Sequence, residues 1–238
     1  MGIIYDKSNS VVGYRIQSIR ELEILISIFD KYPLKTEKWA DFQLFKNAFE
    51  IIKDKKHTTK EGIEELFLIK ASMNTSLKNE QNLKIIEKKR PQRNLENLNI
   101  SDLNWISGFV EGEGCFSISI IKSKLREVNE AVLCRFIITQ HIRDLNILKK
   151  IQEIFECGRI EINNKGYAFF VISSFKDITE KLIPFFNKYP LIGDKNKSLE
   201  DFVTVVELMK ENKHLTKNGL EKIKQIKAGM NKGRKIDK

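Results

Sequence analysis

Residues 106–114 of the chain read ISGFVEGEG, and the interpretation of the fold starts from this stretch. It places Gly108 and Gly112 one helical turn apart in an apolar segment, where small residues let a second helix backbone approach closely. The segment ends at Glu113, just before residues with strand character. A carboxylate fixed at a helix contact is placed to hold a divalent cation, which prefers oxygen ligands. The stretch therefore predicts a helix-packing surface with a metal-binding acid at its end.

The composition favours a folded protein that binds a polyanion. The 238 residues suit one large or two small domains, and 41% of them are hydrophobic, enough for a sizeable core. The formal net charge is +10, with basic residues spread along the chain, which favours nucleic acid as partner. No apolar run approaches the roughly 20 residues of a membrane span, so no membrane is expected. The three cysteines form no CxxC pattern and predict neither a disulfide framework nor a zinc site.

The chain repeats itself at a constant offset of 157 residues. Three blocks carry the repeat: residues 31–34 recur at 188–191 (KYPL), 56–62 at 213–219 (KHTTKEG and KHLTKNG), and 69–74 at 226–231 (IKASMN and IKAGMN). A period this long indicates duplicated domains rather than a solenoid. The duplication is incomplete, because the motif helix and the two strands after it occur only in the later copy. We therefore expect a partial first domain over residues 1–76, a polar linker over 77–99 and a complete domain over 100–238.

Hydrophobic periodicity predicts the elements of the complete domain. The motif helix is followed by strands near 115–121 and 131–140, a helix near 143–156, a hairpin of 159–163 and 167–173, and helices near 175–187, 198–211 and 216–229. Ser198, with Asp201, and Thr216 are expected to cap the last two helices. The order αββαββα predicts an α+β domain in which helices cover one face of a four-stranded antiparallel sheet. The other face carries polar, basic and apolar groups. It could read DNA as ribbons in the major groove, or be an ordinary half-solvated face.

Residues 105–116, WISGFVEGEGCF, resemble the signature helix of the LAGLIDADG homing endonucleases and the first residues of the DNA-contacting strand that follows it. Gly108 and Gly114 match the family's glycines, and Gly112 stands where alanine is usual. The resemblance covers nearly the whole chain and is closest to the two-domain, intron-encoded organellar members, whose sheet is saddle-shaped. Such members carry a motif in each domain, whereas this chain lacks the first one.

The resemblance also implies roles for particular residues. Glu113 corresponds to the family's metal-binding acid, with the backbone oxygen of Gly112 as a further ligand, and Gly108 and Gly112 to its helix-packing positions. Gln140, in the FIITQH strand, corresponds to a residue at the water or metal site. Lys195, in LIGDK, corresponds to a basic residue that stabilises the phosphate, and Lys38 is its counterpart in the first domain.

The resemblance implies DNA contacts on the outer faces of the strands, with Arg135 and Arg15 contacting bases or phosphates. In the complete domain the expected contacts are Ser117, Ser119, Ile121, Arg135, Ile137, Thr139, Arg159, Glu161, Asn163, Phe169, Val171 and Ser173. In the first domain they are Tyr5, Lys7, Arg15 and Gln17.

The function implied by the resemblance is that of a site-specific endonuclease that hydrolyses double-stranded DNA with Mg²⁺, for which Ca²⁺ or Mn²⁺ can substitute in binding. Cutting both strands would require a second motif helix, from another copy of the chain or from an N-terminal segment. The alternatives are a non-cleaving binder of the same fold, such as a maturase acting on intron RNA, or an inactive remnant. The expected location is the matrix of a mitochondrion or another organelle. Because the first domain has only two strands for its apolar helices to cover, we expect an exposed apolar patch that favours oligomers or poor solubility.

Overall fold

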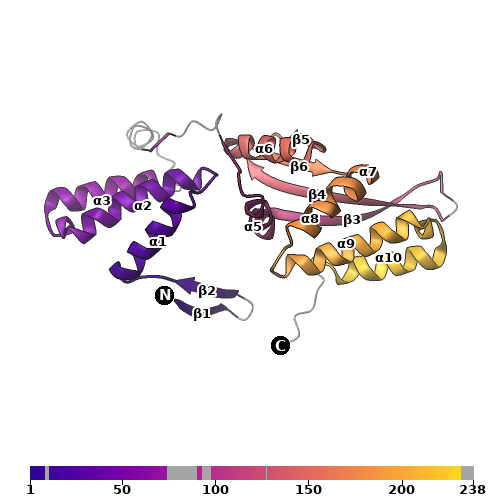
Figure 1. Ribbon diagram of the computed structural model, residues 1–238, viewed down its shortest axis with the longest axis horizontal. Helices are drawn as coiled ribbons and strands as arrows, with labels where there is room; N and C mark the ends of the chain where they lie inside the picture. Colours follow the sequence, from indigo (N-terminus) through magenta and orange to yellow (C-terminus); the bar gives the residue numbers. More distant parts are fainter. Residues whose placement is uncertain (9–10, 74–89, 93–97, 127, 232–238) are drawn as a thin grey trace. The chain divides into compact units, whose positions relative to one another are not determined.

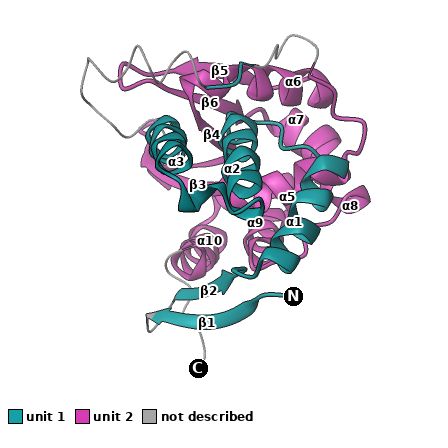
Figure 2. Ribbon diagram, turned by 90° about the vertical axis from the view of Figure 1, so that its left-hand side faces the viewer, with its two compact units in different colours: residues 1–95 teal, residues 96–238 magenta. Residues whose placement is uncertain are grey.

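The computed structural model describes residues 1–8, 11–73, 90–92, 98–126 and 128–231 of the chain. The chain divides into two compact units, residues 1–95 and residues 96–238, which Figure 2 colours separately. Most of the expected linker over 77–99 lies outside the described residues. Within the described residues, no helix combines the length and the apolar character that crossing a bilayer requires.

The described residues of unit 1 form one β-hairpin followed by three helices (Figure 1). The hairpin pairs two antiparallel strands, β1 (Ile3–Ser8) and β2 (Val11–Arg15). The helices are α1 (Ile19–Lys31), α2 (Lys38–Lys53) and α3 (Lys60–Ser72), with the short 3₁₀ turn η1 (Lys56–Thr58) between the last two. Their apolar side chains form two small clusters, one around Phe42 and Phe49 and one around Leu44 and Ile51.

Unit 2 contains the motif helix α5 (Asn104–Glu113), two long strands, a second helix, a hairpin and a helical C-terminal part. After α5 come β3 (Gly114–Lys122), β4 (Glu130–His141), η2 (Ile142–Asp144), α6 (Leu145–Phe155), β5 (Arg159–Ile162) and β6 (Tyr167–Ile172). The C-terminal part comprises α7 (Phe175–Asp177), the π-helical turn η3 (Ile178–Leu182), α8 (Ile183–Lys188), α9 (Lys195–Lys210), η4 (Lys213–Leu215) and α10 (Lys217–Gly229). This order confirms the predicted αββαββα arrangement.

The four strands of unit 2 form one antiparallel sheet in the order β3-β4-β6-β5. Its inner face is built on Phe116, Phe136 and Phe170, each fully buried, and the rings of Phe116 and Phe136 both lie against Phe186 of α8 at 5.7 and 5.8 Å. Helices α5, α6 and α9 contact the strands and share this core. Burial of these rings removes a large apolar area from water and holds the helices on one face. The α+β prediction is therefore confirmed.

A π-helical turn accounts for a change in the offset between the two copies. Ser18 caps α1 in unit 1, and Ser174 caps α7 in unit 2, an offset of 156 residues. Beyond the next helix, Tyr32 corresponds to Tyr189, an offset of 157 residues. The extra residue lies in the stretch that contains η3, where the helix makes the wider turn that typically accommodates a single insertion. The hairpins before it therefore correspond at an offset of 156.

The predicted cap at Thr216 is confirmed, and the one at Ser198 is wrong. The Thr216 hydroxyl accepts the N–H of Gly219 at 3.1 Å, and Thr59 caps α3 in the same way through Gly62. Helix α9 instead begins at Lys195, so Ser198 lies inside its first turn and is buried. The sequence pattern of a capping box was present, but the chain had already entered the helix three residues earlier.

Arg90, from the expected linker, is part of unit 1. Its guanidinium donates to the Asp41 carboxylate at 2.7 Å and to the Ser72 carbonyl at 3.1 Å. A third bond, at 3.2 Å, reaches the Glu37 carbonyl. The side chains of Arg90 and Asp41 are each only 10% exposed. Arg90 thus joins the beginning of α2 to the end of α3 and is not a solvated tether residue. Further along, Leu98 is buried in the core of unit 2.

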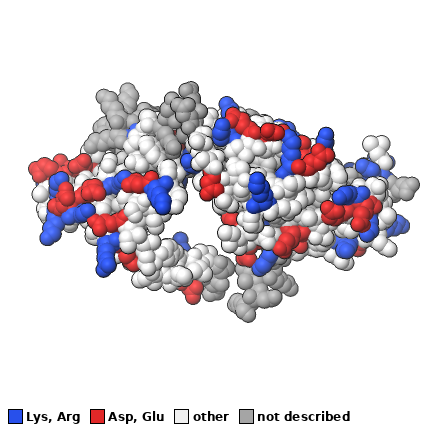
Figure 3. Space-filling model, viewed as in Figure 1, with Lys and Arg blue, Asp and Glu red and all other residues white. Residues whose placement is uncertain are grey.

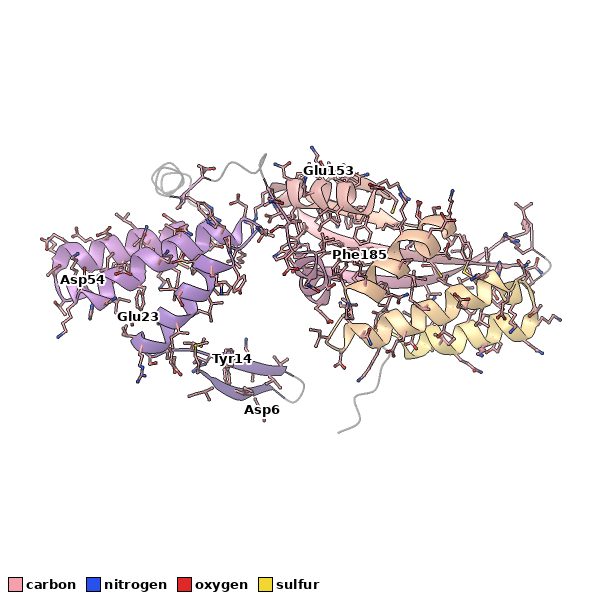
Figure 4. The ribbon with its side chains drawn as sticks, viewed as in Figure 1. Asp6, Tyr14, Glu23, Asp54, Glu153 and Phe185 are labelled. Atoms are coloured by element: carbon pink, nitrogen blue, oxygen red, sulfur yellow. The ribbon has the colours of Figure 1, made fainter. Side chains whose placement is uncertain are left out.

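The hairpin of unit 1 exposes the face that corresponds to the core face of unit 2. Ile4 pairs with Tyr14, and Val12 lies on the same face two residues before Tyr14. Their side chains are 73%, 58% and 66% exposed in that order. At the offset of 156, Val12 and Tyr14 correspond to Ala168 and Phe170, which are completely buried. Figure 4 labels Tyr14 on this hairpin. An exposed apolar surface is therefore present in unit 1, as expected from the incomplete repeat.

Candidate metal site and nucleic-acid interface

The glycines of α5 differ in what surrounds them. A methyl group added at Gly108 or Gly112 would meet no atom within 4 Å, so this face of the helix is open within the described structure. At Gly114 the same group would lie 2.6 Å from the Val110 side chain and 2.9 Å from its carbonyl oxygen. Gly114 is therefore required by the tight turn from α5 into β3, whereas Gly108 and Gly112 are free to accept a neighbouring helix.

The two carboxylates at the end of α5 have separate surroundings. Glu111 accepts the backbone N–H of Gly193 at 2.7 Å, which ties the segment before α9 to the motif helix. Glu113 is exposed, and no described residue forms a hydrogen bond or an ion pair with its carboxylate. Residues two apart on a helix point to different sides, so one acid supports the structure while the other faces solvent. Glu113 is the carboxylate available to a ligand.

Lys195 and Gln140 lie at the same end of the sheet as Glu113. The Lys195 ammonium donates to the Gly114 carbonyl at 2.7 Å, which holds the start of α9 against the end of α5. In the β3–β4 pairing Gly114 is opposite Ile138, so Gln140 lies two residues further along β4, beside the point where α5 ends. The structure thus brings three of the four expected catalytic residues to one end of unit 2.

Lys38 occupies in unit 1 the position that Lys195 has in unit 2. Each is the first residue of a helix 16 residues long, α2 and α9 respectively. The Lys38 ammonium lies 3.4 Å from the buried carboxylate of Asp41, whereas the residue corresponding to Asp41 in unit 2 is Ser198. The two lysines therefore share a position in the repeat but differ in their contacts.

The donor set at the end of α5 fits a hard divalent cation. The carboxylate of Glu113 lies at a helix C-terminus, where backbone carbonyls such as that of Gly112 carry the negative end of the helix dipole. Cations of this kind take six or more oxygen ligands. The described residues contain no group of three or more His, Cys, Asp or Glu side chains that could hold a metal. Water and phosphate oxygens would have to complete the coordination.

The outer face of the sheet carries the side chains that the period-two alternation along the strands predicted for it. Ser117 pairs with Arg135, Cys115 with Ile137, and Thr139 with Phe169, and all of these side chains point away from the helices. Each of them is exposed or half-buried, while the residues between them are buried in the core. Serine and threonine hydroxyls, arginines and a few apolar groups thus line an open antiparallel surface, a shape that suits a groove of duplex DNA.

The two arginines on this face are held differently. The Arg159 Nε donates to a Glu161 carboxylate oxygen at 2.7 Å, its Nη2 lies 2.6 Å from the same oxygen as an ion pair, and its Nη1 donates to the Ser173 hydroxyl at 2.8 Å. Arg135 reaches only the Ser119 hydroxyl, at 3.5 Å, and its Nε is buried without a hydrogen-bond partner. Arg159 is therefore held in one orientation, and Arg135 retains an unused buried donor.

The prediction that Val171 contacts DNA is wrong, because its side chain is buried. Val171 lies on the outer face, opposite Ile137 and Arg159, but is only 3% exposed because β6 is a central strand with a neighbour on each side.

Asn163 is engaged within the hairpin turn, where its side-chain oxygen accepts the N–H groups of Lys165 and Tyr167, both at 3.0 Å. The period-two alternation of a strand predicts which face a side chain is on, but it does not predict burial by adjacent strands or hydrogen bonds within a turn.

Two residues of the outer face are not among the expected DNA contacts. Cys115 is exposed, and Leu133 is 42% exposed opposite Ser119. Leu133 lies two residues before Arg135 on the same strand, so period-two alternation was the signal that places it on this face. By contrast, Cys134 points into the core, where burial raises the pKa of its thiol to about 12.

In unit 1 the expected contacts lie on one face of the hairpin. The Arg15 guanidinium stacks 4.6 Å from the centroid of the Tyr5 ring, and Lys7 is exposed near the end of β1. Gln17 is exposed and follows the end of β2. On the side of each unit that Figure 3 shows, basic and acidic side chains are interspersed.

A sequence model described as "LAGLIDADG endonuclease" matches residues 1–49 and 106–206 of the chain. The chain belongs to the LAGLIDADG endonuclease family. Two relatives from Neurospora crassa are named Probable intron-encoded endonuclease 3 and 2. They are 38% and 34% identical over 91% and 93% of this chain. The aligned segments are 41% and 50% of their lengths, so the chain spans half or less of these two relatives.

Solved LAGLIDADG structures share the fold over almost the whole chain. The homing endonuclease I-SmaMI bound to cleaved DNA has a TM-score of 0.89 and 36% identity, covering 98% of this chain and 79% of the other. The meganuclease I-CpaMI bound to uncleaved DNA also has a TM-score of 0.89 and 36% identity, covering 98% of this chain and 81% of the other. I-SmaMI has also been crystallised on an uncleaved target with calcium ions.

Proposed function

We propose that this chain is part of a site-specific endonuclease that hydrolyses the phosphodiesters of double-stranded DNA with a divalent metal ion. The observation that carries the proposal is the exposed Glu113 carboxylate. It lies at the end of α5, beside Lys195 and at the edge of an open sheet face that bears arginine and hydroxyl side chains. The relatives that bind or cut DNA, I-SmaMI and I-CpaMI, share 36% of their aligned residues with this chain, which supports the same activity here.

In this proposal Glu113 and the Gly112 carbonyl hold Mg²⁺, and Ca²⁺ or Mn²⁺ can replace it for binding. The bound ion would supply a water of lowered pKa and stabilise the leaving oxygen. Lys195 uses one donor on the Gly114 carbonyl and has two N–H groups left for a phosphate oxygen. Gln140 offers an amide that can orient water at the same end of the sheet. Lys38 would take the role of Lys195 for unit 1.

A second motif helix completes the site in this proposal. Cutting two strands requires two acids of this kind, and the sequence carries one copy of the motif. The open face of α5 at Gly108 and Gly112 is where that helix would pack. The exposed apolar face of the unit 1 hairpin would be covered by the missing part of the repeat. Another copy of the chain, or a segment N-terminal to residue 1, could provide them.

A non-cleaving protein of the same fold is the second candidate, and the single motif acid is the observation that favours it. Such a protein would bind intron RNA as a maturase, or bind DNA without cutting. Retention of Glu113 in an exposed position favours cleavage, because nothing in the described fold uses its carboxylate. Related proteins named for the Cox1 intron of Schizosaccharomyces pombe and the ND4 intron of Podospora anserina support a mitochondrial or other organellar location.

Selection from a random duplex library tests the proposal directly. The chain is incubated with the library in Mg²⁺ and, separately, in Ca²⁺, and both cleaved and bound molecules are sequenced. We expect one preferred site, bound in both ions and cut in Mg²⁺, with an affinity that falls by roughly 0.9 log unit per tenfold rise in salt for each phosphate contacted. Bound but uncut duplex would favour the second candidate. Binding that is weak for every duplex and independent of salt would contradict the endonuclease and the non-cleaving DNA binder.

A further inference from the structure

Three side chains form a hydrogen-bonded cluster at the β5 edge of the outer sheet face. Arg159 and Glu161 are two residues apart on β5, and Ser173 follows β6 diagonally opposite Arg159, so all three point to the same side. Arg159 Nε donates to Glu161 at 2.7 Å, the Arg159 Nη2 lies 2.6 Å from the same oxygen, and the bond of Nη1 to Ser173 is 2.8 Å. The side chains of Arg159 and Glu161 are 54% and 49% exposed, so the cluster is open to a ligand.

The cluster leaves part of the guanidinium available in a fixed orientation. Arginine has five N–H donors. The Nε N–H is used by Glu161 and one N–H of Nη1 by Ser173, while Nη2 lies 2.6 Å from the same Glu161 oxygen. The second N–H of Nη1 and the N–H of Nη2 directed away from Glu161 remain available. Because the pair is half-exposed, it contributes little to stability, and its main effect is to limit the rotamers of the arginine.

The neighbouring carboxylate selects among ligands. A phosphate oxygen approaching the two remaining N–H groups would be repelled by the negative charge of Glu161, which already neutralises the guanidinium. A base edge is uncharged, and guanine presents two acceptors, O6 and N7, to the major groove at a spacing that suits an arginine fork. A fixed, neutralised arginine fork therefore fits a guanine better than it fits the backbone.

We infer that Arg159, oriented by Glu161 and Ser173, reads one guanine in the major groove of the DNA target, an inference that rests on the proposed function. Unit 1 has no such cluster, because the corresponding residues at the offset of 156 are Ile3, Tyr5 and Gln17. Arg135 is not equivalent either, since its bond to Ser119 is long and its Nε has no partner. The guanine preference is confined to the half of the target bound by unit 2.

The test compares base preferences of the wild-type chain and Arg159→Lys, both selected from a random duplex library in Ca²⁺. Lysine keeps the charge but loses the fork. We expect the wild type to require guanine at one position in one half-site, and the variant to lose that preference by about 5- to 150-fold, the range for one bidentate base contact, while the other positions stay unchanged. Glu161→Gln should weaken the same position and no other.

The matched control is Glu153→Gln, which breaks a 2.8 Å pair with Lys150 on α6, away from the outer sheet face (Figure 4). It should leave the whole profile unchanged, and circular dichroism verifies the fold of every variant. An unchanged guanine preference in Arg159→Lys would overturn the inference while leaving the endonuclease proposal intact, as would an equal loss at every position. If the wild type selects no duplex, or selects only RNA, the proposed function fails, and the inference fails with it.

Discussion

At the scale of single residues, the two carboxylates of α5 have different roles although they are two positions apart. Glu111 is half-buried and holds the Gly193 N–H, so it orders the segment that leads into α9 and Lys195. Glu113 is exposed beside the Gly114 carbonyl that Lys195 binds. A carboxylate that serves no structural bond is free to bind a metal ion without a cost to the fold.

We therefore expect Glu113→Gln to abolish cleavage of the selected target and to leave DNA binding within about twofold, because the amide keeps the volume but cannot replace an anionic metal ligand. Glu111→Gln should instead lower the free energy of unfolding by about 0.5–1.5 kcal/mol through a weaker bond to Gly193. Cleavage assays, binding titrations and urea unfolding of both variants measure these effects. Full cleavage by Glu113→Gln would remove this residue from the chemistry.

At the scale of elements, both units reuse one capped connection, between α2 and α3 in unit 1 and between α9 and α10 in unit 2. Thr59 and Thr216 accept the N–H of a glycine three residues later, at 3.1 Å in each case. A methyl group added at either glycine would lie 2.0 Å from a backbone carbonyl, of Lys56 or Lys213, so glycine is required at both positions. The repeated KHxTKxG sequence is thus explained by the closeness of two backbone segments.

Thr216→Ala is expected to lower the free energy of unfolding of unit 2 by about 1 kcal/mol, the usual cost of losing an N-cap. The control is Thr204→Ala, which removes a hydroxyl that donates only to the Glu200 carbonyl on the exposed side of α9 and should cost less than about 0.5 kcal/mol. Urea unfolding in a Trp39→Phe background, so that Trp105 reports unit 2, measures both. Equal losses in the two variants would argue against a capping role.

At the scale of the whole molecule, the two units differ in how completely they bury their apolar surfaces. Unit 2 has one continuous core under a four-stranded sheet, whereas unit 1 has two small clusters and a two-stranded hairpin. Ile4, Val12 and Tyr14 are each more than half exposed on one side of that hairpin. Contiguous exposed apolar surface of this kind marks an interaction site or promotes aggregation.

We expect the isolated chain to self-associate at working concentrations, and Ile4→Thr combined with Val12→Thr to shift it toward the monomer. Light scattering over a concentration series measures both. The control is Leu125→Thr, which replaces an isolated apolar side chain, 96% exposed in the β3–β4 loop, and should not change the association. A monodisperse monomer for the unmodified chain would show that the hairpin face needs no partner.

Much of this protein was determined by local patterns in its sequence. The ISGFVEGEG helix, the repeat at 157 residues and the period-two alternation of β3 and β4 were enough to predict the fold, the faces of the sheet and the position of Glu113. Local periodicity suffices for these features, because the direction of a side chain in a helix or strand depends on its neighbours in the sequence.

Other features were decided only by the tertiary structure. The strand order β3-β4-β6-β5 makes β6 central and buries Val171. The Gly193 contact separates the role of Glu111 from that of Glu113, and the approach of Ser173 to Arg159 fixes that guanidinium. Each of these features depends on contacts between residues that are distant in the chain or lie on neighbouring strands. Core packing and sheet register determine which of these residues come into contact, and local sequence patterns do not encode either.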